Sequence, residues 1–292
     1  MMKLTDIRRD PSGIVWKLIF ESASSPAIAE TVVYRYNDRV VVCFSCQSGC
    51  PVGCVFCGTG NHFIRNLTVS EMQLQIEKGL NLAGRAKQMQ IMAMSMGEPA
   101  LNHQAVLEVA EDYLSQGYDF FFSTIGLRDN PFIDQVCLLG QRYWRCGLQF
   151  SLHSLNDQER LSLFRNKRLP YMTIEEMIAA ADKFKARSRS SAYFNWICTP
   201  ANATQENAEE MQILRRHHLT CSVMCNTSCP EKGDIQLAEK FASLVRDCTN
   251  EVTVSTFDPA GQDTIGGGCG QLWYVQEKLK ELRGKGNKNE AL

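Results

Sequence analysis

The chain has 292 residues, 44% of them apolar, which is enough for one substantial hydrophobic core. Its formal charge of −1 excludes a strong overall attraction to nucleic acid, although local clusters of Lys and Arg leave RNA binding open. No apolar run approaches the ~18 residues of a membrane-spanning helix, and the charged first segment, MMKLTDIRRDPSG, lacks an apolar signal region. We therefore expect a cytoplasmic protein without a membrane partner.

The first predicted elements are the two strands of a β-hairpin, GIVWKLIF at 13–20 and AETVVYRY at 29–36. Beyond it, apolar runs typical of strands alternate with amphipathic segments typical of helices. We expect strands at 40–45, 89–95, 119–124, 147–152, 191–198, 221–226 and 252–257, and helices at 68–84, 102–116, 130–140, 157–164, 173–187, 204–217 and 234–247. Capping boxes are predicted for Thr68 with Glu71, Asn156 with Glu159, and Thr173 with Glu176.

This alternation, repeated about six times, predicts an α/β fold in which helices cover a curved or closed parallel sheet. We expect one catalytic domain at 1–283, with an N-terminal β extension at 14–36 and a barrel at 40–275. A charged, flexible tail is expected at 284–292. In such folds the functional groups gather at the carboxyl ends of the parallel strands.

A cysteine loop, GCPVGCVFCGTG at 49–60, follows the first core strand and places Cys50, Cys54 and Cys57 at the spacing C-x3-C-x2-C. Three thiolates in this pattern can ligate three irons of a four-iron cluster. The amino and carboxylate groups of S-adenosylmethionine (SAM) would suit the fourth iron. Structural zinc is the rival, but it usually takes four ligands in spaced pairs. Three unliganded thiols are the remaining alternative.

The motif, with Phe56 before its third cysteine, resembles that of the radical SAM superfamily. Further segments narrow the resemblance to the RlmN/Cfr-type methyl synthases: CGTGNHFIRNLTVSE, MSMGEPALNH, FFFSTIG, LQFSLHSLNDQER and GGGCGQL, in order from about residue 14 to 275. The resemblance implies a partial (β/α)6 TIM-like barrel, a [4Fe-4S] cluster, and SAM. It also implies methylation of an unactivated carbon, C2 or C8, of adenosine in RNA.

By the same resemblance, the cofactor-binding residues would be Gly97, Glu98, Ser123, Ser151, Leu152, His153 and Asn226. The carboxylate of Glu98 could accept hydrogen bonds from the SAM ammonium. From the residues alone, Glu98 could instead be a helix cap, Ser123 a strand-end turn and His153 a structural histidine. Asn226 lies in SVMCNTSCP, which departs from the family pattern.

Two further cysteines and a glutamate match the family's catalytic residues. Cys269 corresponds to the methyl-carrying cysteine, Cys43 to the resolving cysteine seven residues before Cys50, and Glu30 to the proton acceptor. The family uses two SAM molecules, one to methylate Cys269 and one to activate that methyl group at the cluster. Proton loss to Glu30 and attack by Cys43 on the Cys269 sulfur then release the product and leave a disulfide. Without the resemblance, Cys43 would be a buried apolar side chain and Glu30 a strand-edge charge.

Three functions follow as hypotheses: an RNA-adenosine C-methyltransferase, a methyl synthase for a small nucleoside-like metabolite, and a non-catalytic iron–sulfur or zinc protein. The second stays open because we expect this chain to lack the family's usual N-terminal accessory domain, which helps bind RNA. The expected partners are rRNA or tRNA and an external electron donor such as flavodoxin or ferredoxin, and the protein is expected to be a monomer. Cys221, Cys225 and Cys229 could form a second metal site, but a packed row of thiols is the simpler interpretation.

Overall fold

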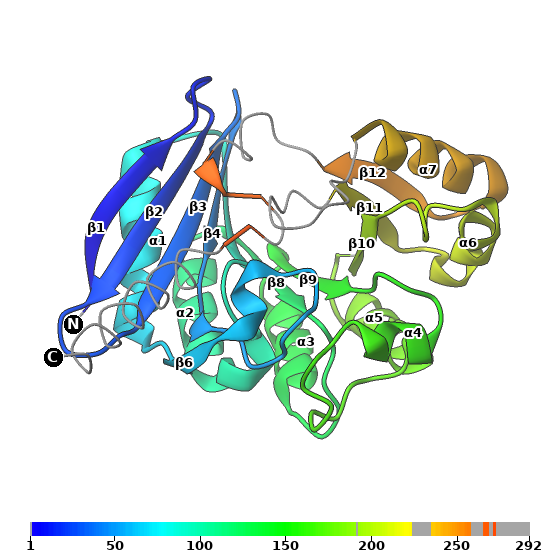
Figure 1. The fold of residues 1–292 in the computed structure, drawn as a ribbon, viewed down its shortest axis with the longest axis horizontal. Helices are drawn as coiled ribbons and strands as arrows, with labels where there is room; N and C mark the ends of the chain where they lie inside the picture. The colour runs from blue at the N-terminus through cyan, green and yellow to red at the C-terminus, as the bar shows by residue number, and fades with distance from the viewer. Residues whose placement is uncertain (1, 191, 224–234, 258–264, 269–270, 273–292) are drawn as a thin grey trace, which may run out of the picture.

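The computed structural model describes residues 2–190, 192–223, 235–257, 265–268 and 271–272. Among these residues, one ten-stranded sheet runs in the order β1-β2-β3-β4-β7-β8-β9-β10-β11-β12, and a two-stranded sheet pairs β5 with β6. Strands β4 and β7 to β12 are parallel, whereas β1 to β4 are antiparallel to one another. Figure 1 shows this sheet from β1 on the left to β12 on the right.

The elements follow one another along the chain as β1 (Met2–Arg9), β2 (Val15–Ser22), β3 (Ile28–Arg35), β4 (Arg39–Phe44), β5 (Gln47–Gly49), η1 (Gly58–Asn61), β6 (Phe63–Asn66), α1 (Val69–Ala83), β7 (Gln88–Ala93), η2 (Pro99–Asn102), α2 (His103–Ser115), β8 (Asp119–Thr124), α3 (Phe132–Arg142), β9 (Cys146–Ser151), α4 (Asp157–Ser162), α5 (Ile174–Arg187), β10 (Tyr193–Cys198), α6 (Gln205–Glu210), η3 (Met211–Leu214), β11 (His218–Val223), α7 (Ile235–Cys248) and β12 (Thr253–Phe257).

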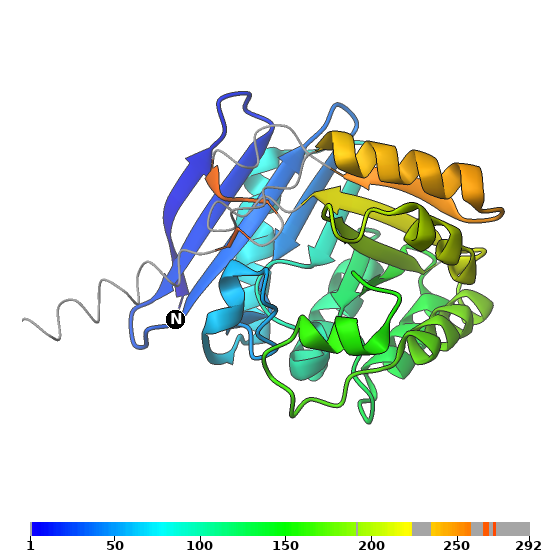
Figure 2. The same cartoon turned by 45° about the vertical axis from the view of Figure 1, so that its right-hand side comes forward.

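The partial barrel is confirmed: each of β4, β7, β8, β9, β10 and β11 is followed by helical structure, and β12 completes the parallel set. Helices α1, α2, α3 and α5 cover the outer face of these strands (Figures 1 and 2). Because side chains alternate along a strand, Val42, Ile91 and Phe120 pack under the helices, while their neighbours Cys43, Met92 and Phe121 face the barrel interior.

The N-terminal extension is larger than the sequence indicated. The predicted hairpin is confirmed as β2 and β3, which pair with Ile19 opposite Glu30. Strand β1, Met2–Arg9, adds a third antiparallel strand at the sheet edge. Its residues are mostly exposed, so it has no continuous apolar run, and this explains why the pattern of apolar residues did not reveal it.

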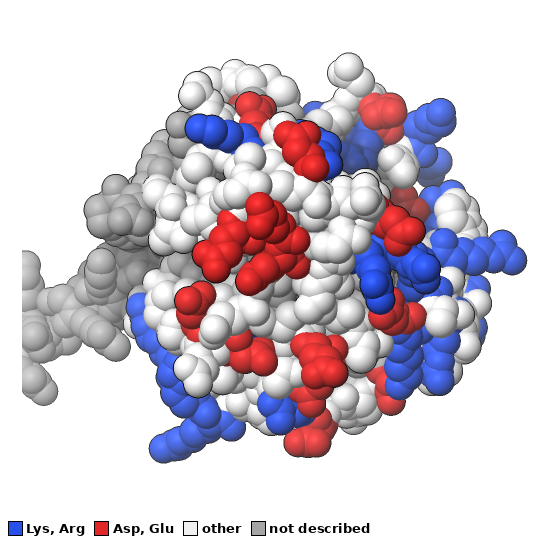
Figure 3. All heavy atoms as spheres, turned by 90° about the vertical axis from the view of Figure 1, so that its right-hand side faces the viewer, with Lys and Arg blue, Asp and Glu red and all other residues white. Residues whose placement is uncertain are grey.

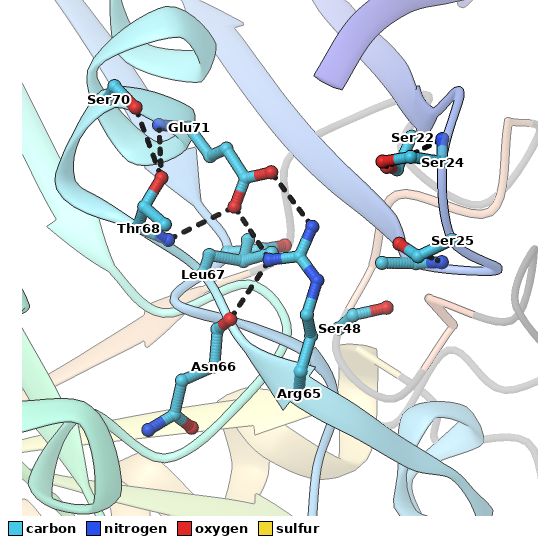
Figure 4. A network of polar contacts seen from close by, with 12 residues as sticks. Ser22, Ser24, Ser25, Ser48, Arg65, Asn66, Leu67, Thr68, Ser70 and Glu71 are labelled. Atoms are coloured by element: carbon cyan, nitrogen blue, oxygen red, sulfur yellow. Dashed lines mark hydrogen bonds and ion pairs between the residues drawn. The ribbon is translucent and has the colours of Figure 1, made fainter. Parts of the chain in front are cut away.

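Two of the three predicted capping boxes are confirmed. Thr68 and Glu71 cap α1 reciprocally, and the Glu71 carboxylate also binds Arg65 of β6 at 2.7 Å (Figure 4). Thr173 and Glu176 cap α5 in the same way. These caps fix where α1 and α5 begin.

The third box is only half formed. The Asn156 side chain accepts from the backbone N–H groups of Gln158 and Glu159. The Glu159 carboxylate, however, accepts from the Ser154 hydroxyl, which in turn accepts from the Asn156 N–H at 3.0 Å. A neighbouring serine therefore replaces the second arm of the box.

Among the described residues, no helix combines the length and apolarity needed to cross a bilayer.

Candidate active site

A cavity of about 730 Å³ lies on the inner face of the parallel strands. Nine of the residues predicted from the sequence line it: Cys43, Cys50, Cys54, Cys57, Gly97, Glu98, Ser123, Ser151 and His153. They come from the carboxyl-terminal parts of β4, β7, β8 and β9 and from the segments that follow these strands. The sheet edge expected to carry chemistry is therefore the edge at which these side chains meet.

The cysteine loop starts from the short β5–β6 ribbon. Gly49 ends β5 with φ +80°, and a Cβ there would lie 1.8 Å from the His62 carbonyl oxygen, so only glycine fits. The Cys50 N–H then donates to that same carbonyl at 2.8 Å. On its other side the loop is backed by the segment after α4, because the N–H groups of Val55 and Arg165 bond across the two segments. The three thiols are thus held by backbone pairing at both ends.

Burial raises the pKa of all three thiols, that of Cys50 to about 12, and the sulfurs of Cys57 and Cys50 add to the rise at Cys54. Backbone N–H groups oppose this effect, including those of Val52 at the Cys50 sulfur and of Gly60 at the Cys57 sulfur. Buried thiols stay protonated unless a cation neutralises them, whereas N–H donors directed at sulfur stabilise metal-bound thiolates.

Glu98 is more deeply engaged by the protein than expected. Only 3% of it is exposed. Its Oε1 accepts from the Ala100 N–H at 3.0 Å and the Thr124 hydroxyl at 2.5 Å, and its Oε2 accepts from the Ile125 N–H at 3.0 Å. Burial raises the carboxyl pKa, and these hydrogen bonds oppose the rise. Glu98 therefore joins the ends of β7 and β8, in addition to capping η2.

Gly97 makes the preceding turn with φ +104°. A Cβ there would lie 2.7 Å from the Gln47 Cβ and 2.9 Å from the Cys46 sulfur. We expect Gly97→Ala to lower the free energy of unfolding by roughly 2–5 kcal/mol, because backbone strain and overpacking add.

Gly117→Ala is the matched control for this prediction. Gly117 has φ +88°, but no atom lies within 4 Å of its hypothetical Cβ, so strain alone should cost about 1–2 kcal/mol. Urea unfolding of both variants measures the difference. If both variants lost the same free energy of unfolding, the close approach of Gln47 and Cys46 would not be the reason why glycine is required at position 97.

His153 lies on the cavity wall and also links two strands. It has φ +63°, and its Nδ1 accepts from the Ile197 N–H at 3.1 Å, which links the end of β9 to β10. Its ring meets the Phe56 ring edge-on at 5.1 Å between centroids. Burial, with a smaller effect from the Arg160 cation, lowers the pKa of His153 to about 3.

This depressed pKa predicts acid sensitivity. As the pH falls below 6.5, His153 takes up a proton in the unfolded chain but not in the folded protein. The contribution of His153 to the free energy of unfolding is therefore complete above pH 6.5 and is lost as the pH falls towards 3. Between these pH values, His153 alone should lower the free energy of unfolding by about 1.4 kcal/mol for each pH unit of acidification. Urea unfolding between pH 7 and pH 4 should show a shallower slope for His153→Gln than for the unmodified protein. Identical slopes would contradict the assignment of a neutral, buried His153.

The other predicted cofactor residues lie in different environments. Ser123 and Ser151 line the cavity at the ends of β8 and β9. The Leu152 side chain is fully buried in the main core, and Leu152 does not line the cavity. Asn226 lies outside the described residues. Of the row of three cysteines, Cys221 is buried and its proximity raises the pKa of the Cys198 thiol, while the other two lie outside the described residues.

Cys43 lies on the cavity wall of β4, opposite Val32 of β3. Glu30, on the same face of β3, is completely buried, and its Oε2 lies 2.7 Å from Nζ of Lys17. Cys269 lies outside the described residues. Its neighbours Gly267 and Gly268 line the same cavity as Cys43.

The segment from 44 to 200, more than half of the chain, matches the family model of the radical SAM superfamily. The probable dual-specificity RNA methyltransferase RlmN of Chlorobium chlorochromatii is 27% identical over 270 residues, which are 87% of this chain and 72% of the relative. The dual-specificity RNA methyltransferase RlmN 1 of Myxococcus xanthus is 28% identical over 280 residues, with coverage of 91% and 75%. A crystal structure of a radical SAM methyltransferase from Sphaerobacter thermophilus matches with a TM-score of 0.78 at 28% identity, over 92% of this chain and 80% of that one. The chain belongs to the radical SAM superfamily.

Within the superfamily it is a methyltransferase of the RlmN/Cfr type, which confirms the family and the enzyme class predicted from the sequence. Membership implies a [4Fe-4S] cluster and SAM. The donor set of this radical SAM methyltransferase fits a cluster, because three thiols line one cavity and backbone N–H groups donate to two of them, Cys50 and Cys57. Within the part of the chain that the structure describes, no three His, Cys, Asp or Glu groups converge on a single metal ion. A cluster does not require such convergence, since each thiolate binds a different iron.

Two residues near the site of this methyltransferase were missed in the sequence. Arg160 is 1% exposed, and its guanidinium donates to the carbonyls of Ile125, Ser151 and Met172. Lys17 forms the ion pair with Glu30. The sequence could have predicted a buried Lys17, because this lysine interrupts the otherwise apolar strand VWKLIF. The residues two positions away on either side are buried, so the lysine lies on the same face as they do. Arg160 had none, since an arginine in an amphipathic helix is ordinarily exposed.

Proposed function

We propose that the protein methylates an sp2 carbon of adenosine in RNA, C2 or C8, through a methylated cysteine. The observation that best supports this is the composition of one cavity wall: Cys43, the three thiols of the cysteine loop, and Gly267 and Gly268 line the same space. Cys269 directly follows Gly268 in the chain. A resolving thiol, three cluster ligands and the approach to the methyl carrier would therefore share a single site.

Cys50, Cys54 and Cys57 are proposed to ligate three irons, with SAM on the fourth. When bound, the cluster and SAM supply a radical that removes hydrogen from a methyl group. The hydroxyls of Ser123 and Ser151 are proposed to contact SAM from the strand ends. Glu98 uses three acceptor positions internally, which leaves about one for the SAM ammonium, so its main contribution would be to shape this wall.

The chain's own thiols would carry the group transfer. The Cys269 thiolate would attack the methyl carbon of one SAM, and S-adenosylhomocysteine would leave. This methyl carbon, after loss of hydrogen to the radical, would bond to the adenine carbon. The adduct would then give a proton to Glu30 and an electron back to the external electron donor that reduces the cluster. Cys43 attacks the Cys269 sulfur, so that the S–S bond forms and the S–C bond breaks. The carbon keeps the bonding pair and takes up a proton to become the methyl group.

RNA is proposed as the substrate because both relatives described above are named RNA methyltransferases. The net charge of −1 requires that RNA contacts be local. On the face shown in Figure 3, many basic side chains lie towards the right margin and others at the lower left, while acidic side chains occupy the middle. A one-electron donor such as flavodoxin or ferredoxin completes the proposed set of partners.

Methyl transfer from labelled SAM tests the substrate class. Reconstituted protein is incubated under anaerobic, reducing conditions with total RNA, and in parallel with a pool of nucleosides and small metabolites. We expect label in RNA adenosine only. Label confined to the small-molecule pool would replace RNA by a nucleoside-like substrate, and 5′-deoxyadenosine without any methylated product would overturn the proposed reaction.

A further inference from the structure

A buried ion pair joins Glu30, the proposed proton acceptor, to Lys17 of β2. Nζ of Lys17 and Oε2 of Glu30 are 2.7 Å apart, and both side chains are 0% exposed. They come from neighbouring strands, since β2 and β3 pair with Lys17 opposite Val32, and Val32 in turn lies opposite Cys43. Lys17, Glu30 and Cys43 therefore share one face of three adjacent strands.

The Lys17 ammonium makes a second contact, to the backbone that leads to Cys269. It donates to the Gly266 carbonyl at 3.2 Å, and one residue further the Tyr34 hydroxyl donates to the Gly267 carbonyl at 3.2 Å. On the far side of Cys269, the Thr59 hydroxyl donates to the Leu272 carbonyl at 2.8 Å. One buried cation thus joins the carboxylate to the segment 266–267.

Stability alone does not account for such a pair. Removing two charges from water costs several kcal/mol per ion, and a well-packed apolar pair is often as stable or more so. A buried glutamate without a cation takes up a proton, because the interior disfavours the charged form. A glutamate that is already protonated cannot accept a proton from a substrate. Nearby titratable groups on this face are Tyr34, Cys43, and Arg8 of β1, which pairs with Asp6.

We propose that Lys17 is a positioning residue that keeps Glu30 in its carboxylate form and fixes the backbone of residues 266–267 beside it. The proposal rests on the proposed function, in which a Glu30 oxygen takes the proton that leaves the substrate carbon. The electrons of that C–H bond stay with the substrate, and Lys17 keeps its own protons throughout. One side chain thereby sets both the basicity of the proton acceptor and the position of the Gly266 carbonyl, three residues before Cys269 in the sequence.

Infrared spectroscopy of protein with carbon-13-labelled glutamate tests this directly. Relative to the unmodified protein, Lys17→Met should gain the carbonyl stretch of one protonated carboxyl at neutral pH, whereas Lys17→Arg and Lys17→Met/Glu30→Gln should not. A merely structural lysine would not change this band. Its absence from Lys17→Met would overturn the proposal whatever the activity.

Turnover provides the second readout. Lys17→Met should still load iron and cleave SAM, but methyl transfer should fall on the order of a hundredfold, as for loss of a general base. If Lys17→Met does not fold, two other variants decide the matter: Lys17→Arg should methylate, and the uncharged double variant should fold without methylating. Methylation by the double variant would overturn the proposal. A protonated band in Lys17→Met together with full activity of Glu30→Gln would instead overturn the proton-acceptor role of Glu30, on which the proposal depends.

Discussion

Cys43→Ala is expected to stop after the carbon–carbon bond has formed, and to accumulate a covalent protein–substrate species joined through Cys269. The variant still has the methyl-carrying cysteine and the three cluster ligands, so every step before resolution remains. No thiol is left to attack the Cys269 sulfur, and release of the product should fall by on the order of a thousandfold or more. Mass spectrometry of the peptide that contains Cys269 measures the adduct and identifies the attached nucleotide.

Two variants control this experiment. Cys269→Ala should show neither methylation nor adduct, because it lacks the carrier. Cys137→Ala removes a buried thiol of α3 that does not line the cavity, and it should turn over normally. Wild-type turnover by Cys43→Ala without an adduct would show that the reaction does not use two cysteines.

Replacing Cys50, Cys54 or Cys57 with Ala should abolish the brown chromophore and SAM cleavage together. Each thiol lines the cavity, and a cluster that loses one of three protein ligands loses the geometry that leaves a single iron for SAM. Iron content, the visible spectrum and the yield of 5′-deoxyadenosine are measured after anaerobic reconstitution. We expect all three to fall to background.

Cys46→Ala is the matched control, because Cys46 is a buried thiol next to the cysteine loop that does not line the cavity. Burial raises the pKa of its thiol well above the ordinary value, with Glu98 and Cys50 adding to the effect, which suits an unliganded core cysteine. This variant should retain iron and cleavage activity. Full cluster occupancy in any of the three ligand variants would contradict the assignment of that ligand.

The sequence predicted the fold well wherever apolar residues form continuous runs. Strands such as Arg39–Phe44 and Cys146–Ser151 are buried on both faces, so their composition alone identifies them. Strand Met2–Arg9 and the short pair Gln47–Gly49 and Phe63–Asn66 were not predicted, because exposed or three- to four-residue strands carry little periodicity.

At the site, the sequence motifs predicted which residues lie together around the cavity, but they did not predict the hydrogen-bond and ion-pair partners of each side chain. The three Glu98 partners include Thr124 and Ile125, which are distant in sequence and meet Glu98 only because β7 and β8 are parallel neighbours. Likewise, from the residues alone Glu30 would be a strand-edge charge, yet it is buried against Lys17. The roles of Cys269 and Asn226 stay predictions, since both lie outside the described residues.

The most direct test of the proposed two-cysteine methylation of RNA uses SAM with a fully deuterated methyl group. The protein is supplied with this SAM, RNA and a reducing system, and the methylated adenosine is recovered by digestion and analysed by mass spectrometry. If the methyl carbon passes through Cys269 and loses one hydrogen before it bonds to adenine, the product must regain that hydrogen from solvent. We therefore expect methyladenosine in which one of the deuterium atoms has been replaced by hydrogen. Transfer of the intact deuterated methyl group, or deuterated product found only outside RNA, would contradict it.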